Sequence, residues 1–547
     1  MFLEIHCYAD AVCNFWPFKR LSKHCLGTPS VPPPVETEVK LEFPSSEVMR
    51  LNKLVPPRRM KPAKQVTQVS LYFDTDKFAL RKNGVMFRVR RTGRRYVQTI
   101  KATGRGLLDR NEWETALTDE KPDFGAMRHT ALEPLLTKKL RRRLRPIFET
   151  RVRRTTYPLE VGGSKVEVAL DRGEVHTGDR SKSLCEIEIE LKVGDKAELF
   201  KLARTIAHAT SAELAVKSKA QRGYELLDGT DNSAARAEPV VLRPETAARD
   251  AFRLIAASCL KQIVANKPAL LAGNPEGVHQ MRVGLRRLRA AISLFSDILE
   301  VSETSAIKSE LKWLTEELGP AREFEVFLKR VLEPARHQNA RLLGMRRLTH
   351  DLAEQRRSSE ERARNAVRSE RFRHLLLTLA TWLEIGDWRH QLDDLLRERG
   401  DTPIAISAAE QLSRRSKKIR KRGRLLTKFD PHRRHKLRIQ AKKLRYAAQF
   451  FETLFSGKKA SRLRKAFLSA LEEVQDCLGD LNDISVHEHL TAKIATEPAP
   501  STKAQDRSRR AFAAGVLTGQ EEARLNTVMA AAVASFDRLA SAKPFWK

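Results

Sequence analysis

Two glutamates and a lysine alternate near the start of the chain. The spacing E-x-E-x-K places Glu36, Glu38 and Lys40 at alternate positions, and the apolar residues Val39 and Leu41 flank Lys40. In a β-strand, alternate side chains share a face, so the three charges point one way and Val39 and Leu41 the other. Two carboxylates on one face repel unless a cation lies between them, and a neighbouring lysine suits an anion that arrives with that cation. The spacing indicates chemistry on phosphate esters and anhydrides; the alternative is a strand with a solvated face.

The same alternation recurs between about residues 66 and 225, and the two signs of charge are segregated. The alternating charges are Arg88, Arg90, Lys101, Glu112, Glu114, Arg151, Arg153, Glu186, Glu188 and Glu190. Each segment is typical of a strand with one ionised face. An ordinary sandwich would carry dispersed charges of mixed sign on its outside. The segregation therefore predicts a barrel with a polar lumen, which has an acidic wall for a metal and a basic wall for phosphates.

Five motifs in this region resemble those of the CYTH domain and occur in that family's order. They are Glu36-x-Glu38-x-Lys40, Tyr72-Phe-Asp-Thr75, Leu80 to Gly84 followed by Arg88-Val-Arg90, Glu186-Ile-Glu-Ile-Glu190, and Lys217-Ser-Lys-Ala-Gln-Arg-Gly-Tyr224. The resemblance covers about residues 35–228. It implies the triphosphate tunnel metalloenzyme fold, an antiparallel eight-stranded β-barrel.

Length and composition set wider limits. A chain of 547 residues is too long for one core, so two or three domains are expected. The net charge of +34 implies an anionic partner, and an aromatic content of 6% weighs against base stacking on single strands. No stretch approaches the ~20 apolar residues that span a bilayer, so no membrane partner is predicted. The six cysteines form no C-x-x-C pair, which favours a reducing cytoplasm over a disulfide scaffold or a zinc site.

The sequence predicts an α+β multidomain protein. Residues 1–34 lack the pattern of a signal peptide and are expected to form a disordered extension before the barrel of residues 35–228. Residues 229–244 combine turn formers with little apolar content and are expected to link two domains. Residues 245–547 are rich in Leu, Ala, Arg, Glu and Lys at helical spacing, which predicts an all-α helical-bundle domain.

Two basic stripes in the helical half share one spacing. The first basic ridge is His279, Arg282, Arg286 and Arg289; the second basic ridge, 156 residues later at the same offsets, is His435, Arg438, Lys442 and Arg445. Each ridge falls within about 80° of a helix surface, opposite an apolar stripe. Residues 318–326 and 478–486 also match. The repeat predicts two related halves, whose pseudo-twofold arrangement could bring the ridges together.

Neither ridge contains an acid, so its like charges at i, i+3 and i+4 spacing repel one another. An external polyanion would complete the charge balance; a solvated face with dispersed acidic partners is the alternative. The leading histidine could donate to a phosphate, or cap and pack.

These ridges resemble motifs of the CHAD domain, which is often fused to CYTH domains. The matching segments are residues 278–289, 435–446 and 474–483, and the resemblance covers roughly residues 245–545. It implies that the basic helices bind inorganic polyphosphate. Glu323 and Glu325 depart from the pattern, since aspartates are usual there.

The residues and the resemblance together predict metal-dependent hydrolysis of inorganic triphosphate, an inorganic triphosphatase activity, beside a polyphosphate-binding domain. Mg²⁺ or Mn²⁺ is expected on Glu36, Glu38, Glu186, Glu188 and Glu190, because carboxylates without a Cys/His cluster suit hard cations. Glu36, Glu38 and Lys40 are the predicted catalytic residues. The predicted triphosphate-binding residues are Lys40, Arg88, Arg90, Lys101, Arg151, Arg153, Lys217, Lys219 and Arg222, and the two basic ridges are the predicted polyphosphate site.

Two alternatives stay open. The barrel could be a hydrolase or cyclase acting on another triphosphate, such as thiamine triphosphate or a nucleotide. The protein could also be a non-enzymatic binder of polyphosphate or nucleic acid, with phosphate contacts and steep salt dependence. Nucleic acid is the less favoured partner. The expected location is the cytoplasm, including polyphosphate granules.

Overall fold

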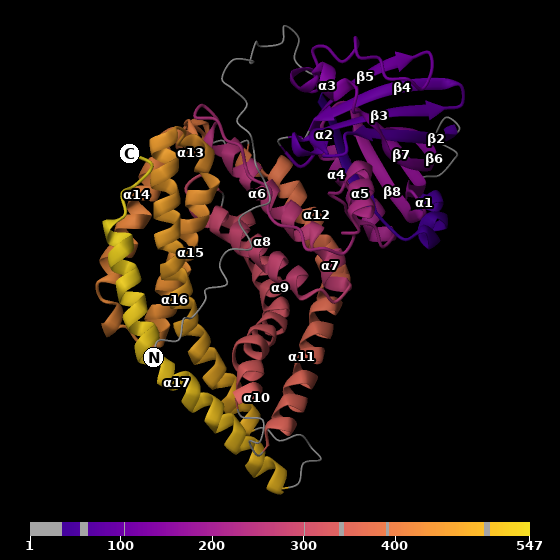
Figure 1. The fold of residues 1–547 in the computed structure, drawn as a ribbon. Helices are drawn as coiled ribbons and strands as arrows, with labels where there is room; N and C mark the ends of the chain where they lie inside the picture. The colour runs from indigo at the N-terminus through magenta and orange to yellow at the C-terminus, as the bar shows by residue number, and fades with distance from the viewer. Residues whose placement is uncertain are drawn as a thin grey trace.

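The computed structural model describes residues 35–54, 64–102, 104, 106–299, 301–338, 344–389, 393–496 and 504–547. The extension expected to be disordered, residues 1–34, lies outside them. A β-rich part formed by the N-terminal segments lies beside a larger helical part (Figure 1). Among the helices in the described ranges, none has both the length and the apolar character needed to cross a membrane.

The β-rich part is a closed antiparallel barrel of eight strands, as the sequence predicts. Neighbours follow the order β5-β4-β3-β2-β6-β7-β8-β1, and β1 closes the barrel by pairing with β5. The strands are β1 Val35–Glu42, β2 Lys64–Asp74, β3 Val85–Thr92, β4 Arg95–Ala102, β5 Asp109–Leu117, β6 Arg145–Val161, β7 Ser164–Thr177 and β8 Arg180–Val193. A short strand, β9 Glu213–Leu214, pairs with the end of β1 on the edge opposite β8.

Alternation along the strands separates an apolar outer face from a charged lumen. Val39 and Leu41 of β1 are fully buried and belong to one core with Leu199 and Phe200 of α4 (Lys196–Ala209). Helix α4 begins where the Asp195 carboxylate accepts a hydrogen bond from the backbone N–H two residues later. The other helices of this part are α1 Val48–Leu54, α2 Ala79–Lys82, α3 Lys138–Arg141 and α5 Lys219–Asp228. Because the outer face is covered by helices, the charges on the opposite face of β1 must share the interior.

The helical part contains two related halves, as predicted. Its helices are α6 Ala248–Ala265, α7 Lys267–Leu271, α8 Pro275–Leu294, α9 Val301–Phe327, α10 Glu333–Gln338, α11 Met345–Arg368, α12 Glu370–Ile385, α13 Asp394–Asp401, α14 Ile404–Gly423, α15 Pro431–Phe450, α16 Lys458–Thr496 and α17 Ala504–Ser541. Helix α8 followed by α9 is repeated by α15 followed by α16. In both copies a ridge arginine lies over a glycine of the following helix: a Cβ on Gly319 would lie 3.2 Å from a guanidinium nitrogen of Arg282, and one on Gly479 would lie 3.9 Å from Arg438.

The two parts share a continuous hydrophobic core. Helix α12 packs on α4 and β9, and Lys267 at the start of α7 pairs with Glu213 of β9. Residues 229–247 form no helix or strand, yet they are tied to the helical part. The Asn266 side chain bonds both the N–H and the carbonyl of Ala235, and Thr453 does the same for Leu242. The connecting segment therefore holds the barrel close to the helices.

Candidate active site

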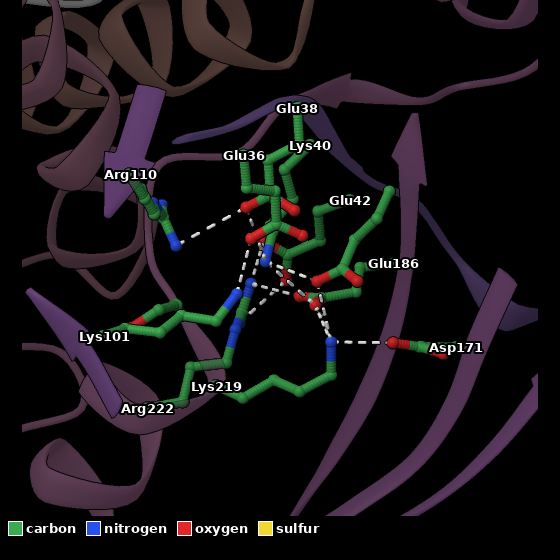
Figure 2. Close-up of polar contacts among 12 residues, drawn as sticks. Glu36, Glu38, Lys40, Glu42, Lys101, Arg110, Asp171, Glu186, Lys219 and Arg222 are labelled. Atoms are coloured by element: carbon green, nitrogen blue, oxygen red, sulfur yellow. Dashed lines mark hydrogen bonds and ion pairs between the residues drawn. The ribbon is translucent and has the colours of Figure 1, made fainter. Parts of the chain in front are cut away.

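The barrel lumen collects charged side chains from seven of the eight strands and from α5. Figure 2 shows acids of β1 and β8 facing lysines and arginines that enter from β4, β5 and α5. Lys40 lies at the centre of this network. Its Nζ is 2.7 Å from Glu188 Oε1, 3.4 Å from Glu186 Oε1 and 3.9 Å from Glu38 Oε1. Burial disfavours its charge, but these three carboxylates outweigh burial and raise the pKa of Lys40. The residue is thus a fixed cation in the lumen.

Three carboxylates form the tightest acidic cluster among the described residues. Oxygen atoms of Asp171, Glu186 and Glu188 lie within 4.8 Å of one another. The Lys219 ammonium, which α5 projects into the lumen, is 2.7 Å from Asp171, 2.5 Å from Glu186 and 3.0 Å from Glu188. Arg154 also pairs with Asp171 and Glu188. Burial acts against ionisation of Asp171 and Glu188, yet the surrounding cations keep the pKa of both carboxyls below the usual range.

This cluster fits a hard divalent cation. Its donors are three carboxylates, the ligands that Mg²⁺ and Mn²⁺ prefer. Glu186 is fully buried, and its Oε2 has no hydrogen-bond partner among the described residues. The Lys219 ammonium occupies the position from which one cation contacts all three acids. A metal held here would exchange with that ammonium, since the acids are already neutralised by protein cations.

The other predicted metal ligands lie apart from the cluster. Glu36 Oε2 is 2.6 Å from Lys101 Nζ, which also lies 2.6 Å from Glu112; burial and the hydrogen bond with Glu112 raise the pKa of Glu36. Glu38 Oε1 is 3.5 Å from Arg110. Glu190 is 2.6 Å from Lys192 of its own strand. The structure thus brings Glu186 and Glu188 together with Asp171, and it does not gather all five predicted ligands at one point.

Most of the predicted phosphate-binding cations line the lumen. Arg88 lies 3.8 Å from Glu112, and Arg90 lies 2.9 Å from Glu114. From α5, Arg222 reaches 2.8 Å from Glu42. Lys217 instead pairs with Glu225 of α5, at 2.8 Å.

The prediction that Arg151 and Arg153 face the lumen is wrong. Both are exposed, and Arg151 pairs with Glu149 of its own strand at 2.6 Å. The buried residues of β6 are Phe148, Thr150 and Val152, so the inward positions are shifted by one residue from the predicted ones. Arg154 is the arginine of this strand that pairs with the lumen acids.

The predicted site omitted several residues of the lumen network, among them Asp171, Arg154 and Arg110. Asp171 follows the alternating apolar positions Val166, Val168 and Leu170, which pack in the outer core, so period-two reading of β7 could have found it. Arg154 belongs to the run Arg151-Val-Arg-Arg154. Residues 151 and 153 make one face of the strand basic and residue 154 makes the other basic, so charge did not show which face points into the lumen. Arg110 lies two residues before Glu112, so period-two reading of β5 places it on the same face as Glu112 and Glu114 and could have found it too.

The two basic ridges converge in the helical part. Arg286 Nε of α8 lies 3.4 Å from the Tyr446 hydroxyl of α15, and Arg282 donates to the Thr315 carbonyl at 3.0 Å. Burial, followed by Arg438 of the same ridge and Arg286 of the other, lowers the pKa of Lys442 to about 7. Burial and the nearby Arg286 lower the pKa of Arg282 to about 10. Such depressed values identify a cluster of cations that lacks sufficient negative charge.

The ridges are not identical in their partners. Burial and Arg322 lower the pKa of His279 to about 4, whereas His435 Nδ1 lies 2.5 Å from the Asn482 side-chain oxygen. Arg289 is exposed. The absence of acids holds only within each ridge, because α16 supplies acidic partners to the second ridge. These are Asp483, 3.8 Å from Arg438, and Glu472, 3.2 Å from Arg445.

Comparisons with known proteins divide the chain in the same way. The sequence model of the CYTH domain matches residues 35–224, and that of the CHAD domain matches residues 254–492. An inorganic triphosphatase of Haemophilus influenzae is 32% identical over 160 residues, which are 28% of this chain and 44% of that protein. An uncharacterised protein of Mycobacterium tuberculosis is 28% identical over 276 residues, 48% of each chain. The chain thus spans about half the length of the curated relatives it matches.

Solved structures resemble each part separately. The CHAD domain of Ricinus communis is 29% identical, with a TM-score of 0.47, and covers 56% of this chain and 96% of that one. A Hippeastrum protein, described as a candidate adenylyl cyclase with a dominant triphosphatase activity, is 19% identical, with a TM-score of 0.27. It covers 35% of this chain and 95% of its own.

Proposed function

We propose that this chain, which joins a CYTH domain to a CHAD domain, hydrolyses inorganic triphosphate in its barrel and binds inorganic polyphosphate with its helices. The domains would comprise residues 35–228 and 245–547. The observation that carries the first half is the carboxylate cluster of Asp171, Glu186 and Glu188, which lies among lysines and arginines in a closed lumen. The triphosphatase of H. influenzae, similar over 28% of this chain, supports the same reaction.

In this proposal Asp171, Glu186 and Glu188 hold Mg²⁺ or Mn²⁺. The bound ion would polarise the scissile phosphoryl group and neutralise developing charge. Lys219, released from the carboxylates by the incoming ion, would turn its ammonium to the phosphate oxygens. Lys40 stays charged because of its acidic neighbours and would bind the same oxygens. Glu36, whose pKa is raised by burial and by Glu112, is the glutamate best suited to accept a proton from the attacking water.

A comparison of substrates tests this function. Full-length protein should release orthophosphate from inorganic triphosphate with a higher kcat/KM than from ATP or thiamine triphosphate. The lumen offers charged side chains for phosphates, and the described residues include no Gly-rich nucleotide loop between a strand and a helix. Preference for ATP with release of a cyclic nucleotide would favour a cyclase, and preference for thiamine triphosphate would reassign the substrate.

The phosphate wall gives a prediction with an internal control. Arg88→Ala should raise KM for triphosphate about 10-fold or more, because it removes a charge-assisted contact inside the lumen. Arg151→Ala, an identical change on the outer face, should leave KM within about twofold. Steady-state kinetics of both variants checks the register of the barrel. Equal losses in the two variants would contradict the outward placement of Arg151 and the reading of the lumen as the phosphate site.

For the helical half, support comes from the convergence of the two ridges. Burial, together with the charge of Arg286, lowers the pKa values of Arg282, Arg438 and Lys442, so cations of the two ridges lie close together. Cations confined in this way are stabilised by a polyanion that bridges them.

The depressed pKa of Lys442 predicts an unusual dependence of stability on pH. Between about pH 7 and the ordinary lysine value of 10.5, the unfolded chain holds this proton and the folded chain does not. The contribution of Lys442 to the free energy of unfolding therefore increases as the pH rises from 7 to 10.5. The melting temperature of wild type minus that of Lys442→Met should be larger at pH 9 than at pH 7. An identical difference at both pH values would show that Lys442 keeps its charge.

A further inference from the structure

The helical part places an arginine against the strand that closes the barrel. Arg253 of α6 is 16% exposed; its Nη1 lies 3.2 Å from Glu384 Oε2 of α12 and 3.8 Å from Asp109 Oδ2 of β5. Glu384 is 2% exposed, so a buried carboxylate holds the guanidinium from the helical side. One arginine therefore connects the helical part to the first residue of β5.

Asp109 lies at the shortest seam of the barrel. Within the described residues, β1 and β5 pair at three positions, Val35 with Asn111, Glu36 with Arg110 and Thr37 with Asp109, whereas every other neighbouring pair of barrel strands has at least five. The Asp109 carboxylate also accepts hydrogen bonds from the Thr37 hydroxyl at 2.9 Å and from Lys196 Nζ at 3.0 Å. A seam with so few backbone pairs depends on side-chain contacts to keep its register.

The next residue reaches the lumen. Arg110 Nη1 lies 3.5 Å from Glu38 Oε1, and Glu38 is 6% exposed and lies 3.9 Å from Lys40. Since neighbouring residues of a strand point to opposite faces, any movement of Asp109 along the seam also moves Arg110 inside. The position of Asp109 thus determines where the Arg110 guanidinium lies relative to the Glu38 carboxylate.

The segment before β5 is fitted to Arg253 as well. A Cβ on Gly106 would lie 2.7 Å from Arg253 Nη1, so the guanidinium rests directly against this backbone. Leu108 is 2% exposed and belongs to the same core as Phe252 and Ile255 of α6. Apolar packing and an ion pair therefore hold the start of β5 on the same helix.

We propose that Arg253 is a positioning residue for the barrel reaction. Through Asp109 it fixes β5 against β1, and so it holds Arg110 on Glu38. The role in the reaction rests on the proposed function, whereas the role in holding the seam does not. Activity of the barrel would then depend on the helical part through one named contact.

A neighbouring arginine provides a matched control. Arg249 lies one turn earlier on α6 and is 20% exposed, but its partners, Asp401 and the Arg389 carbonyl, belong to the helical part. In full-length protein without metal, Arg253→Ala should raise hydrogen exchange of the peptide containing residues 109–111 about fivefold or more. Arg249→Ala should leave exchange of that peptide unchanged, and Arg253→Lys should restore part of the protection. Glu384→Gln, a milder change, should raise the same exchange if Arg253→Ala does not fold.

Kinetics supplies the second measurement. Arg253→Ala should lower kcat/KM for triphosphate about 10-fold by displacing Arg110, whereas Arg249→Ala should not. Adding Glu384→Gln to Arg253→Ala should cause little further loss, because Glu384 acts through the Arg253 guanidinium that the first change removes. Exchange at residues 109–111 that is equal in Arg253→Ala, Arg249→Ala and wild type would overturn the positioning role. A wild-type protein inactive on triphosphate would instead refute the proposed function, and the exchange measurement would still decide the role of Arg253 at the seam.

Discussion

Replacing Glu188 with glutamine is expected to lower kcat for triphosphate hydrolysis by at least about 10²-fold, the range for losing one electrostatic stabiliser. Glu188 contacts Lys40, Lys219 and Arg154, so it organises the cations of the lumen in addition to its proposed place on the metal. Glutamine is nearly isosteric, and the barrel should keep its fold. Steady-state kinetics at saturating Mg²⁺ or Mn²⁺ measures the effect.

Glu149→Gln is the matched control for this change. Glu149 lies on β6, where it pairs with the outward Arg151, so its loss should change kcat less than twofold. Glu38→Gln should also lower kcat by at least about 10²-fold, since Glu38 is buried between Arg110 and Lys40. Near-wild-type turnover of Glu188→Gln with an intact melting transition would remove the carboxylate cluster from the mechanism.

Neutralising either basic ridge is expected to weaken polyphosphate binding about 10²-fold or more at physiological salt. The first set is Arg282, Arg286 and Arg289, and the second is Arg438, Lys442 and Arg445, each changed to glutamine. Combining the sets should add little, because the ridges form one composite site that fails when either side is lost. Calorimetric titration with long-chain polyphosphate at several salt concentrations measures both affinity and its salt dependence.

A third set of cations controls for net charge. Arg414, Lys417 and Lys421 of α14 are exposed and repeat the offsets 0, 3 and 7 of the ridges. Their replacement by glutamine removes the same charge, but it should weaken binding less than threefold. An equal loss in this control would show binding by overall charge alone. Tight binding of duplex DNA together with no binding of polyphosphate would favour the nucleic-acid alternative.

The fold could be predicted from the sequence because its local periodicity and its internal repeat indicate the same architecture. Val39 and Leu41 alternate with Glu36, Glu38 and Lys40, and this period is enough to predict a strand with one apolar and one charged face. The equal spacing of the two basic ridges likewise predicted two related helical halves. Neither inference needed knowledge of which strands or helices are neighbours.

The composition of the site depended on such neighbours, and there prediction failed. Asp171 joins Glu186 because β7 pairs with β8, with Asp171 opposite Glu186 in register. In the run that includes Arg151, Arg153 and Arg154, charge alone could not choose between two registers, and packing of Val152 decided it. In the helical half, Asp483 meets Arg438 only because α16 folds back on α15.

Metal-dependent hydrolysis of inorganic triphosphate tests the central claim most directly. Full-length protein treated with a chelator should release orthophosphate no faster than buffer, and adding Mg²⁺ or Mn²⁺ should restore turnover. Glu188→Gln, measured in the same series, should stay at least about 10²-fold slower after the metal is added. Equal rates with and without metal, or no release from triphosphate under any condition while polyphosphate still binds, would contradict the account.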